Sequence, residues 1–460
     1  MMIAVGPGDA GRSRVTVIGC GHVGVVMAAG LARLGHEVLG MDIDPRRVDE
    51  LSNGEPIFHE PGLRDLLQDG LAAGRLRFTT SHQEAVPDAQ FIFLAVDTPA
   101  TPSGAADLRN VRSAARAIAS ALNGGSPIIV NKSTSPIGTG ETIESILRAG
   151  LAGHGGVPRI VSNPEFLRQG RAVEDFFHPD RIVVGARNLE DAYAVAALYG
   201  PLTSELLITD LRTAEMIKYV ANSFLATRIS FINEVARLCE QIGVDVDEVV
   251  DGVARDPRIG AHFFQPGIGF GGSCLPKDVA ALRYVGETFG VATPVLSAVQ
   301  EVNQAQRTSA VRKLRHALGT LEGAVIAAWG LTFKGGTEDV RDSPARDVVE
   351  LLLNEGAVVR IYDPSISPGG LSSRLASLVT DSPLEAAKGA DALAILTDWP
   401  EFGRVELPLT RAVMAGDVLF DGRNVLERSA AEAAGFRYIG VGRGRALPTT
   451  SQPTRPAAVA

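Results

Sequence analysis

A glycine pattern close to the N-terminus constrains the fold of this 460-residue chain more than any other feature. The β-branched run RVTVI, residues 14–18, leads directly into GCGHVG, in which Gly19, Gly21 and Gly24 have the spacing GxGxxG. An apolar pattern of helical period follows at residues 25–34. A buried strand, a glycine-rich turn and a helix in this order predict the start of a parallel α/β sheet.

An acidic residue follows the next strand at the position that a dinucleotide site requires. Residues 37–41 read as a strand that ends at Asp42, 18 positions beyond Gly24 (42 − 24). In such a site the glycines allow a tight turn, the helix N-terminus faces the pyrophosphate, and the acid binds the ribose hydroxyls. Because Asp42 would repel a 2′-phosphate, the pattern favours NAD over NADP. Val23 in the turn and Arg47 are further candidate contacts, although a surface charge is the alternative for Arg47.

Polar residues also follow the next two predicted strands. Residues 91–96 are followed by Asp-Thr-Pro, and residues 128–131 are followed by the run KSTSP. Ligands of open α/β sheets bind at the carboxyl ends of strands, so Thr98 and Thr134 are predicted to face the cofactor. The alternative for each is a turn-forming hydroxyl close to a proline.

Two further stretches carry candidate reactive groups. Residues 269–278, GFGGSCLPKD, place Cys274 among glycines and three positions before Lys277. A thiolate near a lysine is a nucleophile, and glycines let a ligand approach closely, but an ordinary buried cysteine is the alternative. Earlier, a strand at residues 160–162 leads to Glu165 in NPEFLRQG, which is either a site carboxylate or a surface acid.

Long helices and a second α/β unit follow in the chain. Residues 211–243 have helical periodicity, and Lys218 and Asn222 share one face because they are four apart. That face is either solvated or, if it is buried toward Cys274, a catalytic pair. A connecting helix is predicted at residues 295–318.

Strands are predicted again at residues 324–329, 358–362 and 392–396, without a GxGxxG pattern. This second unit is therefore less suited to a dinucleotide than the first. Lys334, Arg341 and Arg423 follow these strands or lie in loops near them, and such cations can bind phosphates. Taken singly, each has a surface charge as its alternative.

Composition excludes several classes of function. The net charge of −9 argues against a nucleic-acid partner, and no apolar run approaches the ~20 residues of a membrane span. The N-terminus lacks the pattern of a secretory signal. Cys20, Cys239 and Cys274 form no disulfide framework, the histidines have no metal spacing, and we expect a cytoplasmic protein without a metal.

These patterns predict an α/β protein of three domains between disordered tails at 1–13 and 443–460. Residues 14–205 form an N-terminal Rossmann-type dinucleotide-binding domain, and residues 206–318 form a central all-helical domain with a long connecting helix. Residues 319–442 form a C-terminal second Rossmann-like α/β domain.

Six motifs, taken in order, resemble the nucleotide-sugar 6-dehydrogenase family. They are VIGCGHVG, KSTSPIGT, NPEFLRQGRAVEDF followed by HPDRIVVG, AEMIKYVANSFLATRISFINE, GFGGSCLPKD and GLTFKGGTEDVRDSP, and the likeness extends to about Arg423. The resemblance implies oxidation of a sugar 6-hydroxyl to a carboxylate with two NAD, without release of the aldehyde. A cysteine thiohemiacetal and a thioester are the implied intermediates, and the C-terminal domain is implied to bind a UDP-sugar.

The resemblance also implies roles for individual residues. Cys274 is implied to be the nucleophile, and Lys218 and Asn222 are implied to stabilise the oxyanion. Glu165 and Asp278 are the implied carboxylates for water activation and the surroundings of the cysteine. The hydroxyl of Thr134 is implied to place a water. Lys218 is also linked to proton transfer in the first oxidation, and Lys277 and Arg341 resemble cofactor contacts. Substrate contacts are implied for Glu165, Phe166, Leu167, Lys218, Asn222, Arg258, Phe263, Phe270, Gly271, Phe333, Lys334 and Arg423.

Arg258 resembles an arginine that a neighbouring subunit lends to the substrate, which implies a homodimer. HPDRIVVG and FLRQG are closest to the UDP-glucose branch, SCLPKD also occurs in the GDP-mannose branch, and N-acetylhexosamine branches rank third. A catalytically silent sensor of nucleotide sugars is disfavoured, because no implied catalytic residue is missing. The chain departs from the family at Asp97, Ser135 and Gln169, where proline or asparagine, valine and glutamate are usual.

Overall fold

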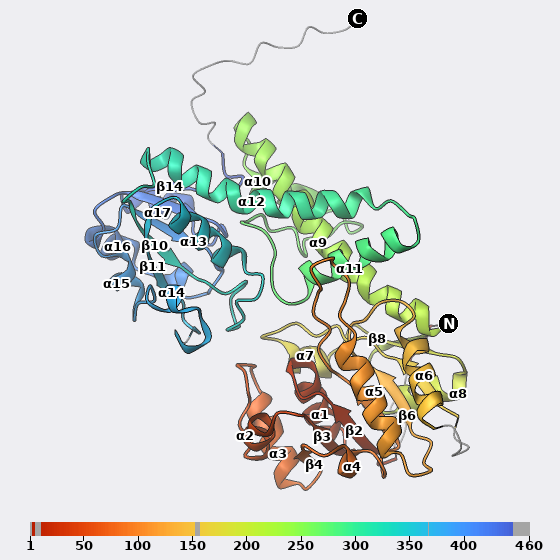
Figure 1. Ribbon diagram of the computed structural model, residues 1–460. Coiled ribbons are helices and arrows are strands. Elements are labelled where there is room, and N and C mark those ends of the chain that lie inside the picture. Colours follow the sequence, from red (N-terminus) through yellow and green to blue (C-terminus); the bar gives the residue numbers. More distant parts are fainter. Residues whose placement is uncertain (1, 5–10, 152–156, 367, 445–460) are drawn as a thin grey trace, which may run out of the picture. The chain divides into compact units, whose positions relative to one another are not determined.

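The computed structural model describes residues 2–4, 11–151, 157–366 and 368–444, and the chain forms two compact units (Figure 1). Unit 1 comprises Met1–Asn222 and Lys277–Ala292, and unit 2 comprises Ser223–Pro276 and Thr293–Ala460. The predicted α/β class with two parallel sheets and a helical centre is confirmed. The helical centre is, however, divided between the two units.

Unit 1 contains a nine-stranded sheet in the order β1-β9-β8-β7-β6-β5-β2-β3-β4. The six strands from β4 to β7 are parallel and have the order 3-2-1-4-5-6 of dinucleotide-binding folds. Their direction of progression reverses between β2 and β5, which makes the carboxyl ends of these strands the expected ligand site. The strands are β1 Met2–Ala4, β2 Arg14–Ile18, β3 Glu37–Met41, β4 Leu76–Thr79, β5 Phe91–Leu94, β6 Ile128–Asn131, β7 Arg159–Ser162, β8 Arg181–Ala186 and β9 Glu205–Thr209.

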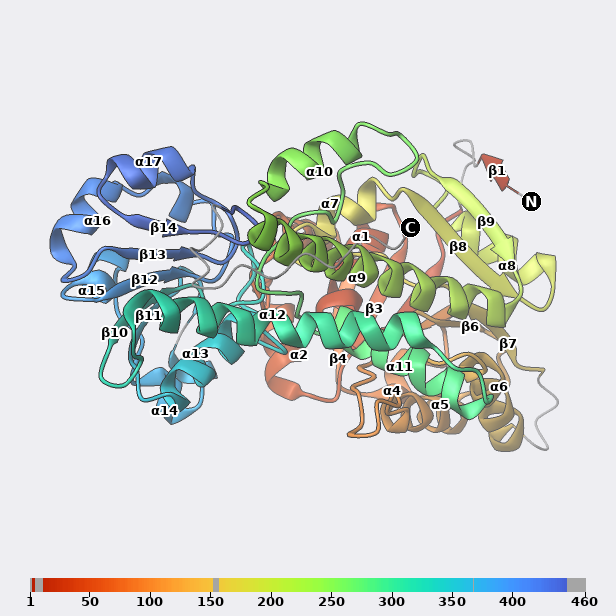
Figure 2. The ribbon, with the colours of Figure 1, turned by 90° about the horizontal axis from the view of Figure 1, so that it is seen from above.

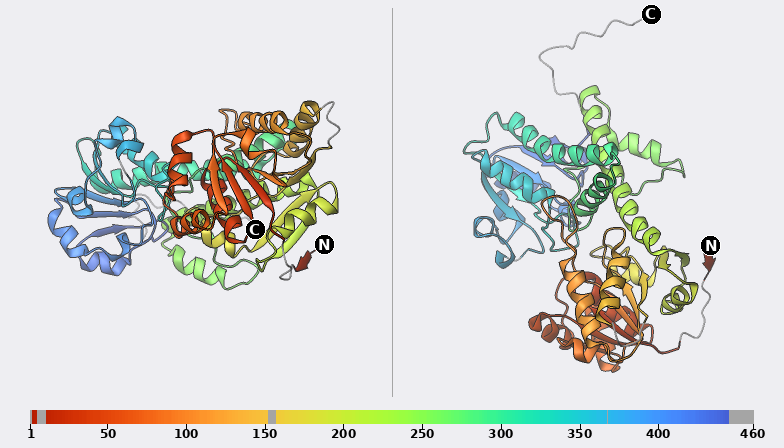
Figure 3. Two further views of the ribbon diagram at one scale, coloured as in Figure 1. Left: turned by 90° about the horizontal axis from the view of Figure 1, so that it is seen from below. Right: turned by 45° about the vertical axis from the view of Figure 1, so that its right-hand side comes forward.

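Helices cover both faces of this sheet (Figure 3). One hydrophobic core includes residues of α1, α2, α3, α7 and α8, and the other includes residues of α4, α5 and α6. Strands β5 and β6 are buried along their whole length, as expected for central parallel strands. The helices are α1 His22–Arg33, α2 Pro45–Ser52, α3 Leu63–Ala72, α4 His82–Ala85, α5 Arg109–Ala121, α6 Thr139–Gly150, α7 Ala172–Phe177 and α8 Leu189–Ala197.

Unit 2 contains a five-stranded parallel sheet in the order β11-β10-β12-β13-β14. A parallel bridge between Ile361 and Val379 adds a rudimentary strand beyond β11, so the sheet repeats the order of the first. Its elements are β10 Val325–Trp329, α13 Pro344–Asn354, β11 Val358–Tyr362, η1 Pro368–Gly370, α14 Ser373–Ala376, α15 Pro383–Ala387, β12 Ala392–Ile395, η2 Phe402–Arg404, α16 Leu407–Val413, β13 Val418–Asp421, α17 Arg428–Ala433 and β14 Arg437–Ile439.

Four further helices complete the chain: α9 Leu211–Ile242, α10 Val246–Ala254, α11 Leu275–Thr288 and α12 Pro294–Leu318. Within unit 2, α12 packs against the second half of α9 (Figure 2), where Ser230 Oγ donates to the carbonyl of Val299 at 2.8 Å and Lys313 forms an ion pair with Glu240. In the part of the chain that the structure describes, no helix combines the length and apolarity that a membrane crossing needs.

The predicted tails differ in part from the structure. Residues 2–4 form β1, which pairs antiparallel with β9, because the exposed edge of that strand accepts a further strand. At the other end, Arg443 is held by Asp247 at 2.6 Å, so ordered structure continues past residue 442. Residues 5–10 and 445–460 of the predicted tails lie outside the described residues.

Candidate active site

The glycine turn after β2 leaves room for a ligand at one position. A Cβ on Gly24 would lie 1.8 Å from the carbonyl oxygen of Gly19, which itself has a φ of +92°, so these two glycines serve the turn and its packing. A Cβ on Gly21 would meet nothing within 4 Å. No side chain caps the N-terminus of α1, within which Val23 lies, and its first turn holds no acid. The N–H groups there can therefore bind a pyrophosphate.

Asp42 lies at the end of β3 and is oriented by its neighbours. Its Oδ2 accepts hydrogen bonds from the backbone N–H of Cys20 at 2.8 Å and from Arg47 at 2.9 Å, and its Oδ1 accepts from the N–H of Asp44 at 3.0 Å. The guanidinium of Arg47 thus contacts Asp42 instead of standing alone on the surface. A carboxylate oxygen accepts two hydrogen bonds, so Oδ1 retains capacity for a ribose hydroxyl.

The two threonines predicted to face the cofactor lie on adjacent loops. Thr98 is buried, and its hydroxyl donates to the backbone carbonyl of Thr134 at 2.5 Å. This bond joins the loops that follow β5 and β6, so the hydroxyl of Thr98 supports the loop after β6. Thr134 is half-buried.

A buried ion pair lies beyond the carboxyl end of β7. Lys218 Nζ of α9 is 2.9 Å from Glu165 Oε1, and each side chain is 6% exposed. Glu165 Oε2 also accepts from the N–H of Leu167 at 2.6 Å. Burial opposes ionisation of Glu165, but the ammonium of Lys218 and these hydrogen bonds outweigh it and lower the pKa of Glu165. Glu165 is therefore not a surface acid. The ring of Phe166 lies 5.2 Å from Lys218 Nζ.

Lys132 was not a candidate from the sequence, although it directly follows the buried strand β6. Its ammonium is 3.0 Å from Asn163 Oδ1 and 5.6 Å from the centre of the Tyr199 ring. Burial lowers the pKa of Lys132 to about 7, while the charge of Glu165 acts to raise it and that of Lys218 to lower it. A lysine at the carboxyl end of a central strand was the signal that could have identified it.

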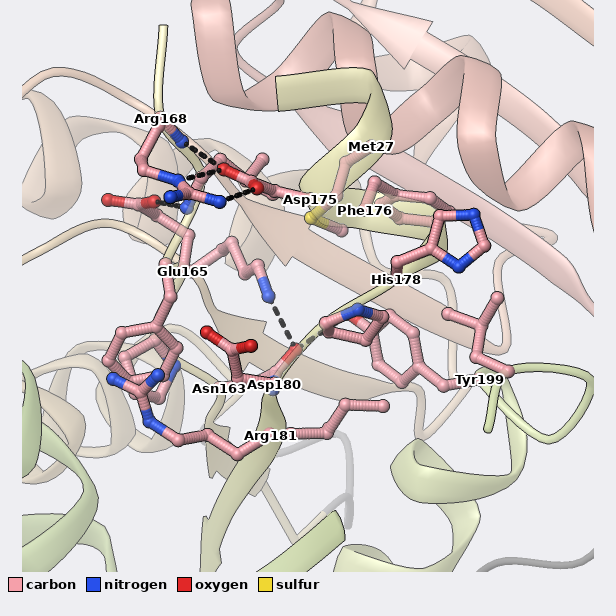
Figure 4. Close-up of a pocket in the computed structure, with 17 residues that line it drawn as sticks. Met27, Asn163, Glu165, Arg168, Asp175, Phe176, His178, Asp180, Arg181 and Tyr199 are labelled. Carbon is pink, nitrogen blue, oxygen red and sulfur yellow. Dashed lines mark hydrogen bonds and ion pairs between the residues drawn. The ribbon is translucent and has the colours of Figure 1, made fainter. Parts of the chain in front are cut away.

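A cavity of about 70 Å³ in unit 1 connects these groups (Figure 4). Glu165, Asn163 and Tyr199 lie around it, and on its wall Arg168 binds both carboxylate oxygens of Asp175 at 2.5 and 2.9 Å. The cavity is large enough for water, and its walls carry the polar groups that water needs. Further lining residues are Met27, Lys132, Phe166, Leu167, His178, Asp180 and Arg181.

A second polar cluster lies one helical turn further along α9. Asn222 Nδ2 donates to Asp278 Oδ2 at 2.6 Å, and Lys277 Nζ is 2.6 Å from Asp278 Oδ1. Lys218 and Asn222 are both buried, so the alternative of a solvated helix face is wrong. The two side chains face different carboxylates, Glu165 and Asp278.

Cys274 is exposed and directly precedes the first residue of α11, whereas Cys20 and Cys239 are buried. The alternative of an ordinary buried cysteine is therefore wrong. The positive end of the helix dipole favours an anion at this position. The hydroxyl of Ser273 lies 3.7 Å from the sulfur of Cys274.

The glycines before Cys274 fit against the protein's own chain. A Cβ on Gly271 would lie 2.2 Å from the carbonyl oxygen of Asp342, and one on Gly272 would lie 2.8 Å from the ring of Phe333. Both glycines are therefore required for this packing, and the interpretation that they also admit a ligand stays a prediction. They are needed because loops of unit 2 pack directly on this backbone.

Arg423 joins several of these loops. Its guanidinium donates to the carbonyls of Leu396 at 3.0 Å, Gly269 at 3.0 Å and Phe333 at 3.1 Å. Burial lowers the pKa of Arg423 from its usual value. Arg423 is thus not a surface charge, and two of the five N–H groups of a guanidinium remain for a ligand.

The other predicted residues of unit 2 have the following surroundings. Phe270 is buried, and its backbone N–H and carbonyl bond the side-chain amide of Asn303 at 2.8 and 3.0 Å. Arg341 binds both carboxylate oxygens of Asp339 at 2.9 and 2.7 Å. Lys334 Nζ lies 5.7 Å from the centre of the Phe333 ring.

Arg258 and Phe263 precede the Cys274 stretch. The side chain of Arg258 is 87% exposed and forms an ion pair with Asp256 at 2.5 Å. Arg258 therefore lies on the surface of its own unit and not in a pocket of it. Phe263 has a φ of +61°, a left-handed backbone that is strained for an aromatic residue.

Asp363 ends β11 as Asp42 ends β3, but its own loop occupies it. Its Oδ2 accepts from the N–H of Leu331 at 2.8 Å and from the N–H of Thr332 at 3.1 Å, and the indole of Trp399 lies 3.3 Å away. This arrangement leaves little capacity for the ribose of a second dinucleotide.

The chain is similar to known proteins over most of its length. Three models of the UDP-glucose/GDP-mannose dehydrogenase family match the chain: the NAD binding domain at residues 13–203, the central domain at 212–305 and the UDP binding domain at 327–428.

Individual relatives match over most of their length. UDP-glucose 6-dehydrogenase TuaD of Bacillus subtilis is 41% identical over 94% of this chain and 93% of its own. A UDP-glucose 6-dehydrogenase of Pseudomonas aeruginosa is 41% identical over 94% of this chain and 98% of its own. The structure of a UDP-glucose dehydrogenase from Pyrobaculum islandicum has a TM-score of 0.86 and 39% identity, covering 95% of this chain and 99% of that one.

Proposed function

This chain belongs to the UDP-glucose/GDP-mannose dehydrogenase family, and from that membership we propose that it oxidises UDP-glucose to UDP-glucuronate in two NAD-dependent steps. The observation that carries the proposal is the array on α9. There, the buried Lys218 faces Glu165, and the buried Asn222 faces Asp278 one turn later. Buried charged groups contribute little to stability, so such an array is typical of an active site.

The residues of the glycine turn fit the cofactor. The open position at Gly21, the uncapped N-terminus of α1 and the oriented carboxylate of Asp42 would hold the pyrophosphate and a ribose. Arg47, Val23 and Thr98 are proposed to line the same site. When bound, NAD would accept a hydride, that is, two electrons and one proton, from carbon 6 of the sugar in each oxidation.

In the first oxidation, the hydroxyl oxygen would lose its proton and carbon 6 would lose a hydride to the cofactor, which leaves an aldehyde. Lys218 and Asn222 are proposed to stabilise the developing negative charge on that oxygen, and Lys218 to take part in the proton transfer. One such hydrogen-bond donor contributes roughly 3–4 kcal/mol to the transition state. The ionised Glu165 supports this role because it holds the lysine side chain in place.

In the second stage, the sulfur of Cys274 is proposed to add to the aldehyde carbon, which forms a carbon–sulfur bond and a thiohemiacetal. Oxidation of that adduct gives a thioester. Water then attacks the thioester carbon, with Glu165 as the proposed base, and the carboxylate product leaves as the cysteine thiol is restored. Thr134 is proposed to place that water and Asp278 to shape the surroundings of the cysteine.

Substrate contacts are proposed for two groups of residues. Near the Glu165–Lys218 pair these are Phe166 and Leu167. In unit 2 they are Arg258, Phe263, Phe270, Gly271, Phe333, Lys334 and Arg423, and Lys277 and Arg341 are proposed to contact the cofactor. Arg423 supports a phosphate-binding role through its two remaining N–H groups.

An assay of NADH at 340 nm tests the function. We expect two NADH for each UDP-glucose and no turnover by Cys274→Ala, with unchanged far-UV circular dichroism. Iodoacetamide should inactivate the wild type with one adduct per chain, because the other two cysteines are buried. Accumulation of a free aldehyde after one NADH would contradict the mechanism.

GDP-mannose is the alternative substrate, since the family includes dehydrogenases of both sugars. Initial rates measured side by side with UDP-glucose, GDP-mannose and UDP-N-acetylhexosamines decide between them. Absence of NADH formation with every sugar nucleotide would favour a binding protein without catalytic activity.

A homodimer and a cytoplasmic location complete the proposal. Four apolar side chains on the unit 2 part of α9 are 57–71% exposed, and their spacing of seven, seven and four residues places them on one face: Phe224, Phe231, Leu238 and Ile242. Such a row is typical of a helix that pairs with a second copy, and Arg258 would then reach the partner's site. Light scattering should give a dimer for the wild type and a smaller mass for Phe231→Glu, with Glu234→Ala as the control.

A further inference from the structure

Lys132 lines the cavity beside Glu165, but the function proposed above gives it no role. The side chain is buried, and its Nζ is held 3.0 Å from Asn163 Oδ1. Asn163 is itself fixed, because its Nδ2 donates to the carbonyl of Val183 at 2.7 Å and its Oδ1 accepts from the hydroxyl of Tyr199 at 2.7 Å. The amide oxygen of Asn163 is therefore oriented toward Lys132.

This lysine is costly for the fold. Among the described residues it forms no ion pair, and a neutral amide with an aromatic ring compensates a buried charge only in part. Natural cores keep such a group where it has a task at a site.

We propose, on the basis of the function proposed above, that Lys132 is a positioning residue that tunes the electrostatic environment of the Glu165–Lys218 pair through the cavity it shares with Glu165. It acts on the reaction through Glu165 and does not itself touch the sugar. At low pH the three side chains hold two positive charges and one negative charge. At high pH, with Lys132 neutral, they hold one of each.

The direction of the coupling follows from the charges. Burial lowers the pKa of Lys132 to about 7, against the attraction of Glu165 and with the repulsion of Lys218. In return, the charge of Lys132 helps to lower the pKa of Glu165. Loss of the Lys132 proton near neutral pH therefore makes Glu165 a stronger base, which favours its proposed role in activating water.

Other charged groups also face this cavity and enter the same balance. Arg168 and Asp175 neutralise each other as a two-point ion pair on its wall (Figure 4). The remaining titratable lining groups are His178, Asp180, Arg181 and Tyr199, whose hydroxyl donates to Asn163. The cavity admits water, so Lys132 can exchange protons although it is buried.

A titration without substrate tests the coupling directly. The enzyme is labelled with ¹³Cε-lysine, and the Lys132 signal is assigned by its loss in Lys132→Gln. We expect the Lys132 signal to titrate near pH 7 in the wild type. It should titrate at lower pH in Glu165→Gln and at higher pH in Lys218→Met. Lys313, a buried lysine paired with Glu240 in unit 2, is the internal control and should not move.

Identical Lys132 titrations in the wild type and both variants would overturn the inference. The unchanged Lys313 signal shows that unit 2 of each variant is folded, and protection of unit 1 amides in hydrogen exchange shows the same for unit 1. Because this measurement needs no turnover, it decides the role of Lys132 even if the enzyme oxidises no sugar nucleotide, which would instead refute the proposed function.

Kinetics test the consequence for catalysis. The wild-type kcat with UDP-glucose should rise about tenfold between pH 6 and 8, since the neutral fraction of a lysine with a pKa of about 7 rises about tenfold over this range. The kcat of Lys132→Met should not change over this pH range. The kcat of Lys132→Arg, whose side chain stays charged, should remain at the value that the wild type has at low pH. A variant that loses thermal stability but keeps the wild-type pH profile would show a purely structural lysine and contradict the proposal.

Discussion

Replacement of Lys218 by methionine should destabilise unit 1 and abolish activity together. The change removes the ammonium 2.9 Å from Glu165 and leaves a carboxylate with 6% exposure without its ion-pair partner. Removal of one partner from a buried pair costs about 3–5 kcal/mol, whereas replacement of both by neutral groups of similar size is close to neutral. The double variant Lys218→Met/Glu165→Gln should therefore regain most of the stability of unit 1 but none of the activity.

The pH dependence of this loss of stability follows from the pKa of Glu165. Because the pair lowers that pKa, its contribution to stability is present at neutral pH and is lost as the pH falls through the folded-state pKa. The loss in Lys218→Met should accordingly be full at neutral pH and become smaller only below the ordinary carboxyl pKa of 4.5.

Hydrogen exchange measured by mass spectrometry is the suitable assay, with peptides from β7 and from the unit 1 part of α9. Both tryptophans, Trp329 and Trp399, belong to unit 2, so their fluorescence reports on that unit and serves as the control. If the double variant were as unstable as Lys218→Met, the cost would come from lost packing and not from an uncompensated charge. That result would refute the reasoning.

Three further outcomes are expected. Burial raises the pKa of Glu215 to about 7, although two N–H groups at the start of α6 donate to its carboxylate. The folded state therefore keeps this proton to a higher pH than the unfolded state, and stability falls as the pH rises from about 4.5 to 7. Glu215→Gln should remove that slope, worth about 3 kcal/mol, in urea unfolding followed by circular dichroism at pH 5 and 8. Gly24→Ala should abolish NAD binding in calorimetry, because its Cβ would meet a backbone oxygen at 1.8 Å, while Gly21→Ala should fold normally and only weaken binding. Gly271→Ala should lower the urea midpoint of the tryptophan transition, because its Cβ would lie 2.2 Å from the carbonyl of Asp342, and an unchanged midpoint would contradict the packing described here.

Local patterns were sufficient for much of the fold. The strand β6 has the predicted bounds, and α9 ends one residue before its predicted end, because runs of buried β-branched residues and a long helical period are properties of neighbouring positions. Strand β8, by contrast, was missed, since RIVVGA was considered only as part of a motif. The rudimentary strand at Val379 rests on a single bridge to a distant residue, and such pairing has no local signal.

The sequence by itself determined the two α/β sheets, the glycine turn with its acid and the family to which the chain belongs, since these depend on residue types at fixed spacing. Only the tertiary structure decided which charges meet. It paired Lys218 with Glu165 and brought Lys132 to the same cavity from another strand, and it showed that Gly271 and Gly272 make room for the protein's own loops. Burial and charge coupling depend on which segments the fold packs together, and spacing along the chain does not contain that information.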